Sequence, residues 1–138
     1  MKDEPHIKVS EVMTGAVRTI DSMATAREAM AAMSEAGVSS LVIARRDEQD
    51  EFGLLGIRDL AEHVVAASRS PDRVNVYEIM RKPVLMLDAE MDIKYAIRLL
   101  VRLGISRGLV VDHERRLVGI ATLRDMVLSY AEAGAGAP

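Results

Sequence analysis

The feature that most constrains this chain is an internal duplication. Shifted by 67 residues, "VSEVMTGAVRTIDSMATAREAMAAMSEAGVSS" aligns without a gap on "VYEIMRKPVLMLDAEMDIKYAIRLLVRLGISR". The offset then falls to 66 within "RRDEQDEF", a charged stretch in which a change of loop length costs little. Two copies of one unit are therefore predicted, rather than an array of short repeats. The matched pairs after the slip are Gly53/Gly119, Arg58/Arg124 and Asp59/Asp125.

Each copy predicts a helix with clear end signals. In the first copy, Thr25 and Glu28 have the spacing of a capping box, and Gly37 follows as a C-terminal stop. In the second copy, Asp92 is the expected cap and Gly104 the stop. Apolar residues between these signals recur at helical spacing and predict one buried stripe per helix. The stripes are Ala26, Ala29, Met30 and Met33, and Ile93, Ala96, Ile97 and Leu100.

Short runs rich in Val and Ile around these helices are typical of strands. "VRTI" and "VLML" precede the helices, paired runs follow each glycine, and further helices are predicted over 58–67 and 123–131. The predicted fold class is α+β, with two tandem β-α-β-β-α repeats packed face to face with pseudo-two-fold symmetry, because a unit of about 60 residues buries little surface alone. The predicted boundaries are 9–67 for repeat 1, 68–75 for a linker, 76–132 for repeat 2 and 133–138 for a flexible tail.

Composition narrows the function classes. The chain is 49% hydrophobic and 28% charged, which is typical of a globular protein, and its net charge of -3 offers no attraction to nucleic acid or an anionic membrane. It has no cysteine, and His6, His63 and His113 lack a second ligand at metal-binding spacing, so no metal site is predicted. No catalytic nucleophile arrangement is visible, which predicts that the chain is not an enzyme. Without a signal peptide or an apolar run near the roughly 20 residues of a membrane helix, the cytoplasm is the expected location.

The segment 91–103 carries more apolar residues than one stripe requires, because Tyr95, Leu99 and Val101 lie outside it. Such a surface is typical of a contact with another protein. Burial against the other repeat is the alternative, and the sequence leaves both open.

The duplicated sequence resembles the CBS domain pair, also called the Bateman module, over residues 9–132. The resemblance rests on "EVMT" and "EIMR", on "GVSSLVI" and "GISRGLVV", and on "LVGIATLRD", which occur at matched spacing. It implies a stand-alone two-repeat CBS protein that forms a homodimer. It also implies an adenine nucleotide (AMP, ADP or ATP) as regulatory ligand in the cleft between the repeats, with no obligatory cofactor. The family builds two such clefts crosswise, each from the Asp-bearing turn of one repeat and from the opening strand and post-glycine turn of the other.

The two clefts are predicted to be unequal. In the better one the resemblance places Asp125 on the ribose hydroxyls and Thr122 near the phosphate. In the weaker one Gly56 replaces that threonine and supplies no hydroxyl, and Arg81 replaces Thr14. The better cleft is predicted to contain Thr14, Ala16, Val38, Ser39, Arg107, Ile120, Thr122, Arg124 and Asp125. The weaker one is predicted to contain Lys82, Pro83, Ile105, Ser106, Leu54, Gly56 and Asp59.

The chemistry of the turn agrees with this assignment. A helix N-terminus offers unpaired N–H groups and positive dipole charge to a phosphate, and a carboxylate accepts two hydrogen bonds from a ribose diol. Thr122 and Asp125 also have the spacing of a plain capping box, and Arg107 and Arg124 also fit as solvated surface charges.

The predicted function is a regulatory module that senses an adenine nucleotide and passes its occupancy to an unidentified partner through the packing of its repeats. The alternative is an interaction or scaffolding dimer with a vestigial cleft and no ligand.

Overall fold

The computed structural model describes residues 5–135. The chain divides into two compact units. The repeat-1 unit consists of residues 18–84, and the repeat-2 unit consists of residues 5–17 and 85–135. Each unit carries one three-stranded sheet and several helices, so the predicted α+β class and the two tandem repeats are confirmed. The short segment that opens each repeat in sequence belongs to the unit of the other repeat.

The repeat-1 unit has the sheet order β1-β2-β3, in which β2 pairs parallel to β1 and antiparallel to β3. Its core lies between the sheet and the helices and includes Leu41, Ile43, Leu55, Leu60 and Val64. Its elements are β1 (Thr19–Ile20), α2 (Ala26–Ala36), β2 (Ser40–Ile43), β3 (Gly53–Gly56), α3 (Ile57–Leu60), the π-helix η1 (Ala61–Val65) and the 3-10 helix η2 (Val76–Glu78).

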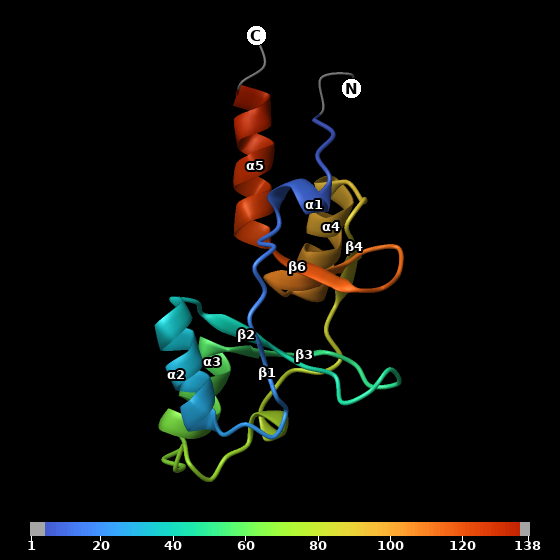
Figure 1. Ribbon diagram of the computed structural model, residues 1–138. Coiled ribbons are helices and arrows are strands. Elements are labelled where there is room, and N and C mark those ends of the chain that lie inside the picture. The colour runs from blue at the N-terminus through green and yellow to red at the C-terminus, as the bar shows by residue number, and fades with distance from the viewer. Residues whose placement is uncertain (1–4, 136–138) are drawn as a thin grey trace. The chain divides into compact units, whose positions relative to one another are not determined.

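The repeat-2 unit has the matching sheet order β4-β5-β6 with the same directions. Within this unit the N-terminal segment with α1 packs beside α4 and α5 (Figure 1). Its core includes Leu87, Ile93, Leu100, Val110 and Met126. Its elements are α1 (Val9–Val12), β4 (Met86–Asp88), α4 (Ile93–Leu103), β5 (Arg107–Val111), β6 (Leu117–Thr122) and α5 (Leu123–Ala135).

The helix ends follow the predicted local chemistry. The hydroxyl of Thr25 accepts the N–H of Glu28 at 3.1 Å, and the carboxylate of Glu28 accepts the N–H of Thr25 at 3.1 Å. The carboxylate of Asp92 accepts the N–H of Lys94 at 2.8 Å. Gly37 and Gly104 end α2 and α4 with φ of 65° and 66°, where a side chain would be strained. The predicted caps and stops are confirmed.

Two helices differ from the predicted ranges. The helix expected over 58–67 has only one α-helical turn, and the N–H of Ala66 then donates to the oxygen of Ala61 at 2.8 Å, as in a π-helix. Apolar spacing does not separate these two forms, because both bury Leu60 and Val64. The second helix, α5, continues to Ala135, into the segment predicted as a flexible tail, where alanines favour helix. Residues 136–138 lie outside the described part of the chain.

Backbone hydrogen bonds attach each opening segment to the sheet of the other repeat. Leu54 and Arg81 exchange N–H···O bonds of 3.0 and 2.8 Å, and Thr14 and Ile120 exchange bonds of 2.9 and 3.0 Å. The two pairs are related by the offsets of the duplicated sequence. Each opening segment therefore adds an edge to the sheet, beside β3 in one unit and β6 in the other.

The outer face of α4 carries exposed apolar side chains. Tyr95 is 53% exposed and Val101 is 65% exposed. Leu99 is half-buried against the core of the repeat-2 unit, which corrects its predicted place on this face. Within residues 5–135, no helix has the length and apolar character needed to span a bilayer.

Candidate functional site

The junction of β6 and α5 forms a turn with an exposed carboxylate. The hydroxyl of Thr122 accepts a hydrogen bond from the backbone N–H of Asp125 at 3.1 Å. This bond is one half of a capping box between Thr122 and Asp125. The other half, a bond from the N–H of Thr122 to the carboxylate of Asp125, is not formed. This carboxylate is 45% exposed, and Nη1 of Arg124 lies 3.8 Å from it. Because α5 is a regular helix of 13 residues, its first turn combines this acceptor with N–H groups and positive dipole charge.

Other predicted residues lie around the same turn. Thr14 is paired through its backbone with Ile120, two residues before Thr122 on β6. Arg107 stands directly opposite Thr122 in the β5–β6 ladder, and opposite residues of an antiparallel pair share one face of the sheet. The repeat-2 unit alone thus holds a hydroxyl and a carboxylate at the end of β6, with Arg107 at the opposing position of β5. Ala16 and Arg124 belong to the same unit and are exposed.

The residues predicted to join a cleft from the other repeat lie in the turn between a helix and the next strand of each unit. Val38 and Ser39 are exposed in the turn between α2 and β2, where the oxygen of Ser39 accepts the N–H of Ile57 at 2.9 Å. Ile105 and Ser106 occupy the matching turn between α4 and β5, and the oxygen of Ser106 accepts the N–H of Leu123 at 2.7 Å. Their participation in ligand binding stays a prediction.

The matching turn of the repeat-1 unit holds its carboxylate differently. Oδ2 of Asp59 accepts the N–H of Gly56 at 2.8 Å, and Oδ1 of Asp59 accepts a hydrogen bond from Nε of Arg81 at 3.1 Å. The side chain of Asp59 is only 5% exposed. Both oxygens of this carboxylate are therefore engaged inside the unit. Sequence reasoning missed the ion pair, although Arg81 and Asp59 match Thr14 and Asp125 in the duplication.

Lys82, predicted as a basic residue of the weaker cleft, is also engaged. Its ammonium forms an ion pair with the carboxylate of Asp50. The hydrogen bond from Lys82 and one from the backbone N–H of Arg46 hold the pKa of Asp50 well below its ordinary value. Lys82 thus neutralises a side chain of its own unit. Beside it, Pro83 is exposed, whereas Leu54 is buried and bonded to Arg81 through the backbone.

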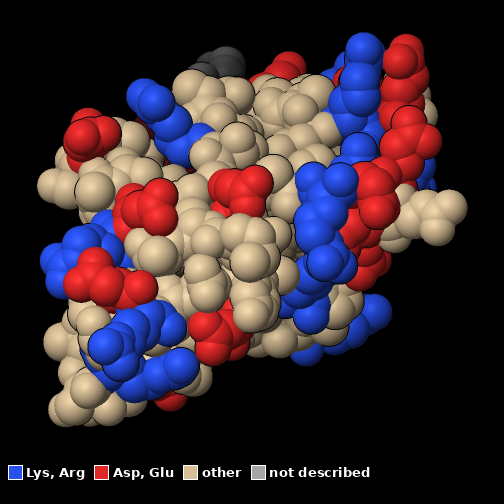
Figure 2. All heavy atoms as spheres, turned by 60° about the horizontal axis from the view of Figure 1, so that its bottom comes forward, with Lys and Arg blue, Asp and Glu red and all other residues tan. Residues whose placement is uncertain are grey.

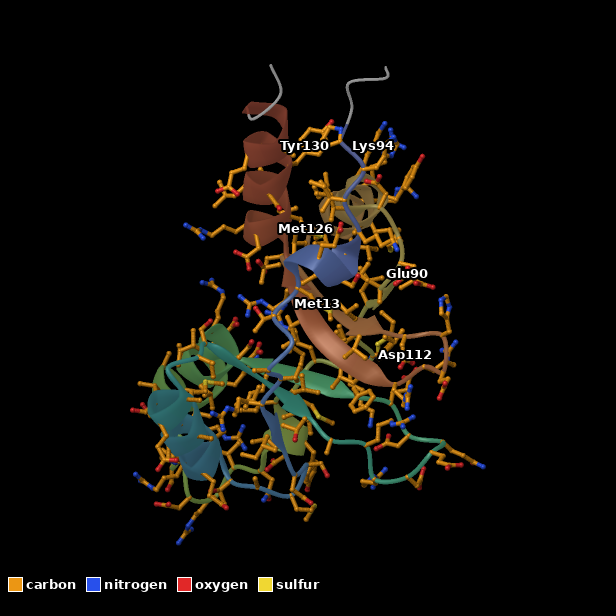
Figure 3. The ribbon with its side chains drawn as sticks, turned by 45° about the horizontal axis from the view of Figure 1, so that its top comes forward. Met13, Glu90, Lys94, Asp112, Met126 and Tyr130 are labelled. Carbon is orange, nitrogen blue, oxygen red and sulfur yellow. The ribbon has the colours of Figure 1, made fainter. Side chains whose placement is uncertain are left out.

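In each unit, a methionine of the opening segment packs on a glycine of the neighbouring strand. A Cβ on Gly119 would lie 2.5 Å from Sδ of Met13 and 2.9 Å from the backbone oxygen of Thr14. Met13 is labelled in Figure 3, where the N-terminal segment leaves α1. A Cβ on Gly53 would likewise lie 2.6 Å from Sδ of Met80. The absence of a side chain at these glycines permits the close approach of Met13 and the backbone of Thr14 in one unit and of Met80 in the other. Sequence reasoning missed both contacts, although the duplication aligns both methionines and both glycines.

The charged surface shows no separation by sign on the face drawn in Figure 2, where acidic and basic side chains lie side by side. This pattern fits the small net charge of -3. Within the described residues, no three His, Asp or Glu side chains gather as a metal site would require.

Comparison with known proteins places the chain in a family. A model of the CBS domain matches residues 9–66 and residues 76–132. The chain belongs to the CBS domain family. This CBS chain is 36% identical over 122 residues to an uncharacterised protein of Methanopyrus kandleri, covering 88% of its own length and 61% of that relative. It thus spans less than two thirds of this relative.

Two solved structures show the same CBS fold. A hexameric CBS-CP12 protein from bloom-forming cyanobacteria has a TM-score of 0.85 and 30% identity, covering 96% of this chain and 76% of that one. The cytosolic domain of the Mg²⁺ channel MgtE, in complex with ATP, has a TM-score of 0.70 and 26% identity, covering 88% of this chain and 48% of that one.

Proposed function

We propose that this CBS protein is a regulatory module that binds an adenine nucleotide at the turn between β6 and α5. The observation that carries the proposal is the half-exposed carboxylate of Asp125 at the start of a 13-residue helix, with Thr122 in the same turn and Arg107 opposite Thr122 in the β5–β6 ladder. A relative of the same fold, the MgtE cytosolic domain, was solved with ATP. Family membership and local chemistry therefore favour the same ligand class.

Each residue has a defined role in this proposal. The carboxylate of Asp125 accepts hydrogen bonds from the two ribose hydroxyls. The phosphate lies toward the first turn of α5, near the hydroxyl of Thr122 and the positive charge of Arg107. Thr14 and Ile120 fix the edge of the sheet on which the nucleoside rests. Contacts of Ala16, Val38 and Ser39 with the base and ribose stay a prediction from the family resemblance.

The module is proposed to report nucleotide occupancy to a partner protein in the cytoplasm rather than to catalyse a reaction. Such coupling requires only that the nucleotide binds one conformation more tightly than another. A coupling of about 1–3 kcal/mol, typical of allosteric proteins, is sufficient.

A thermal-shift panel of AMP, ADP, ATP, S-adenosylmethionine and NADH tests the ligand class. At 100 times its dissociation constant, a nucleotide that binds only the folded chain adds about 2.7 kcal/mol to the free energy of unfolding. For a chain of this size that corresponds to a rise in Tm of roughly 8–10 °C. If no compound in the panel raises Tm, the site is vestigial and the interaction module becomes the better function.

The exposed face of α4 leads us to propose a homodimer, because Tyr95 and Val101 suit a two-fold contact. We expect light scattering to give about twice the chain mass of 15.1 kDa at micromolar concentration. Val101→Asp should shift the protein toward monomer, since it places a charge in the apolar contact. Met23→Asp is the matched control, because Met23 is 63% exposed and lies outside α4. A monomeric mass for the unaltered chain would contradict the proposal.

A further inference from the structure

The two matched turns of this chain hold their aspartates in opposite states. Asp125 is 45% exposed and 3.8 Å from the nearest guanidinium nitrogen of Arg124. Asp59 is 5% exposed, and its two carboxylate oxygens accept hydrogen bonds from Arg81 and Gly56 at 3.1 and 2.8 Å. The difference lies within each unit and coincides with the residue that the opening segment supplies: Thr14 beside β6 and Arg81 beside β3.

Arg81 is firmly held in this position. Its backbone exchanges two hydrogen bonds with Leu54 on β3. The next residue, Lys82, is paired with Asp50 from the loop between β2 and β3. The side chain of Arg81 is 58% exposed, but it reaches Asp59 from a segment that is fixed by its main chain and by the neighbouring ion pair.

The buried state of Asp59 also requires a partner. A carboxylate removed from water is costly unless charge and hydrogen bonds compensate it, and the guanidinium of Arg81 with the N–H of Gly56 provides both. These donors hold both oxygens, and with only 5% of the side chain exposed little of the carboxylate is open to a ribose diol. A nucleotide that used Asp59 would first have to displace Arg81.

We propose that Arg81 is an internal occupant of the Asp59 turn, which closes this half of the duplicated site and limits the chain to one nucleotide. The proposal rests on the proposed function and deepens it, because it names the residue that sets the binding stoichiometry. Arg81 takes the place of the ribose hydroxyls as donor to the carboxylate. The open turn, with Thr14 in the matching position, remains for the nucleotide.

A double variant, Arg81→Thr with Gly56→Thr, should open a second nucleotide site. It places in the repeat-1 unit the threonines that the repeat-2 unit has at Thr14 and Thr122. Gly56 has φ of -104°, and a Cβ there would meet nothing nearer than Oδ2 of Asp59 at 3.5 Å, so a side chain fits. The matched control is Arg27→Thr, which removes an exposed arginine paired with Asp72 in the same unit. Circular dichroism checks that each variant is folded.

The first measurement needs no nucleotide. A water-soluble carbodiimide with glycine ethyl ester labels accessible carboxylates, and peptide mass spectrometry reads the rate at each aspartate. We expect Asp59 to react more slowly than Asp125 in the unaltered chain. In the double variant its rate should rise about tenfold, the factor expected for loss of one hydrogen bond to a charged group. The Arg27→Thr control should leave the rate at Asp59 unchanged. Equal labelling of both aspartates in the unaltered chain would overturn the proposal.

The second measurement is equilibrium dialysis with AMP. We expect one AMP per unaltered chain and per Arg27→Thr chain, and two per double-variant chain. Two AMP on the unaltered chain, or still one on a folded double variant whose Asp59 has become reactive, would show that Arg81 does not set the stoichiometry. If the unaltered chain binds no AMP, the proposed function fails for this nucleotide, and the labelling rates alone decide whether Arg81 closes Asp59.

Discussion

Replacing Asp125 by alanine is expected to weaken nucleotide binding by about 1.5–3 kcal/mol, or roughly 10- to 150-fold in Kd, the range for hydrogen bonds to a charged group. The variant removes the proposed acceptor for the ribose hydroxyls. It keeps the backbone N–H that donates to the hydroxyl of Thr122 at 3.1 Å, so the start of α5 is preserved. Isothermal titration calorimetry with the best nucleotide of the thermal-shift panel measures the loss.

Asp59→Ala is the matched variant, and it should show the opposite pattern. Binding affinity should change little, because Arg81 already engages this carboxylate. The free energy of unfolding should fall more than for Asp125→Ala, since the N–H of Gly56 and the guanidinium of Arg81 both lose their buried partner. Circular dichroism and urea unfolding separate loss of fold from loss of binding. Two equal sites, or equal losses of affinity in both variants, would contradict the assignment.

Local chemistry explains which parts of the fold could be predicted from the sequence. The Thr25–Glu28 box joins residues three apart, and the ends at Gly37 and Gly104 need only a positive φ. Such features depend on few neighbours, so the sequence pattern predicts them well. The π-helix after Leu60 was not predicted because it buries the same apolar positions as an α-helix.

The missed part of the candidate site depends on contacts between distant segments. Arg81 and Asp59 are 22 residues apart, and they meet only because the opening segment of repeat 2 pairs with β3. The duplication identified the two positions and the substitutions at them, and it led to the prediction of a weaker second turn. It did not predict that the substituted arginine would bind the aspartate. That contact follows from the crosswise pairing of the opening segments, which the structure supplies.

Gly119→Ala is expected to lower the free energy of unfolding by about 3 kcal/mol, the upper end of the range for added volume in a packed site. The new Cβ would lie 2.5 Å from Sδ of Met13 and 2.9 Å from the backbone oxygen of Thr14. A methionine side chain can move, but the backbone of Thr14 is held by two hydrogen bonds to Ile120, so β6 and the opening segment must separate. Urea unfolding measures the change.

Gly53→Ala is the matched control in the other repeat. Its Cβ would meet Sδ of Met80 at 2.6 Å and Cβ of Ile43 at 3.2 Å, with no backbone atom among its three nearest neighbours. Rotation of Met80 relieves most of this clash, so the loss of stability should be clearly smaller. Gly119→Ala should also weaken nucleotide binding, because it displaces Thr14 from the proposed site, whereas Gly53→Ala should leave affinity unchanged. Equal effects of the two variants on stability and on binding would mean that the packing of Met13 over Gly119 does not position the site.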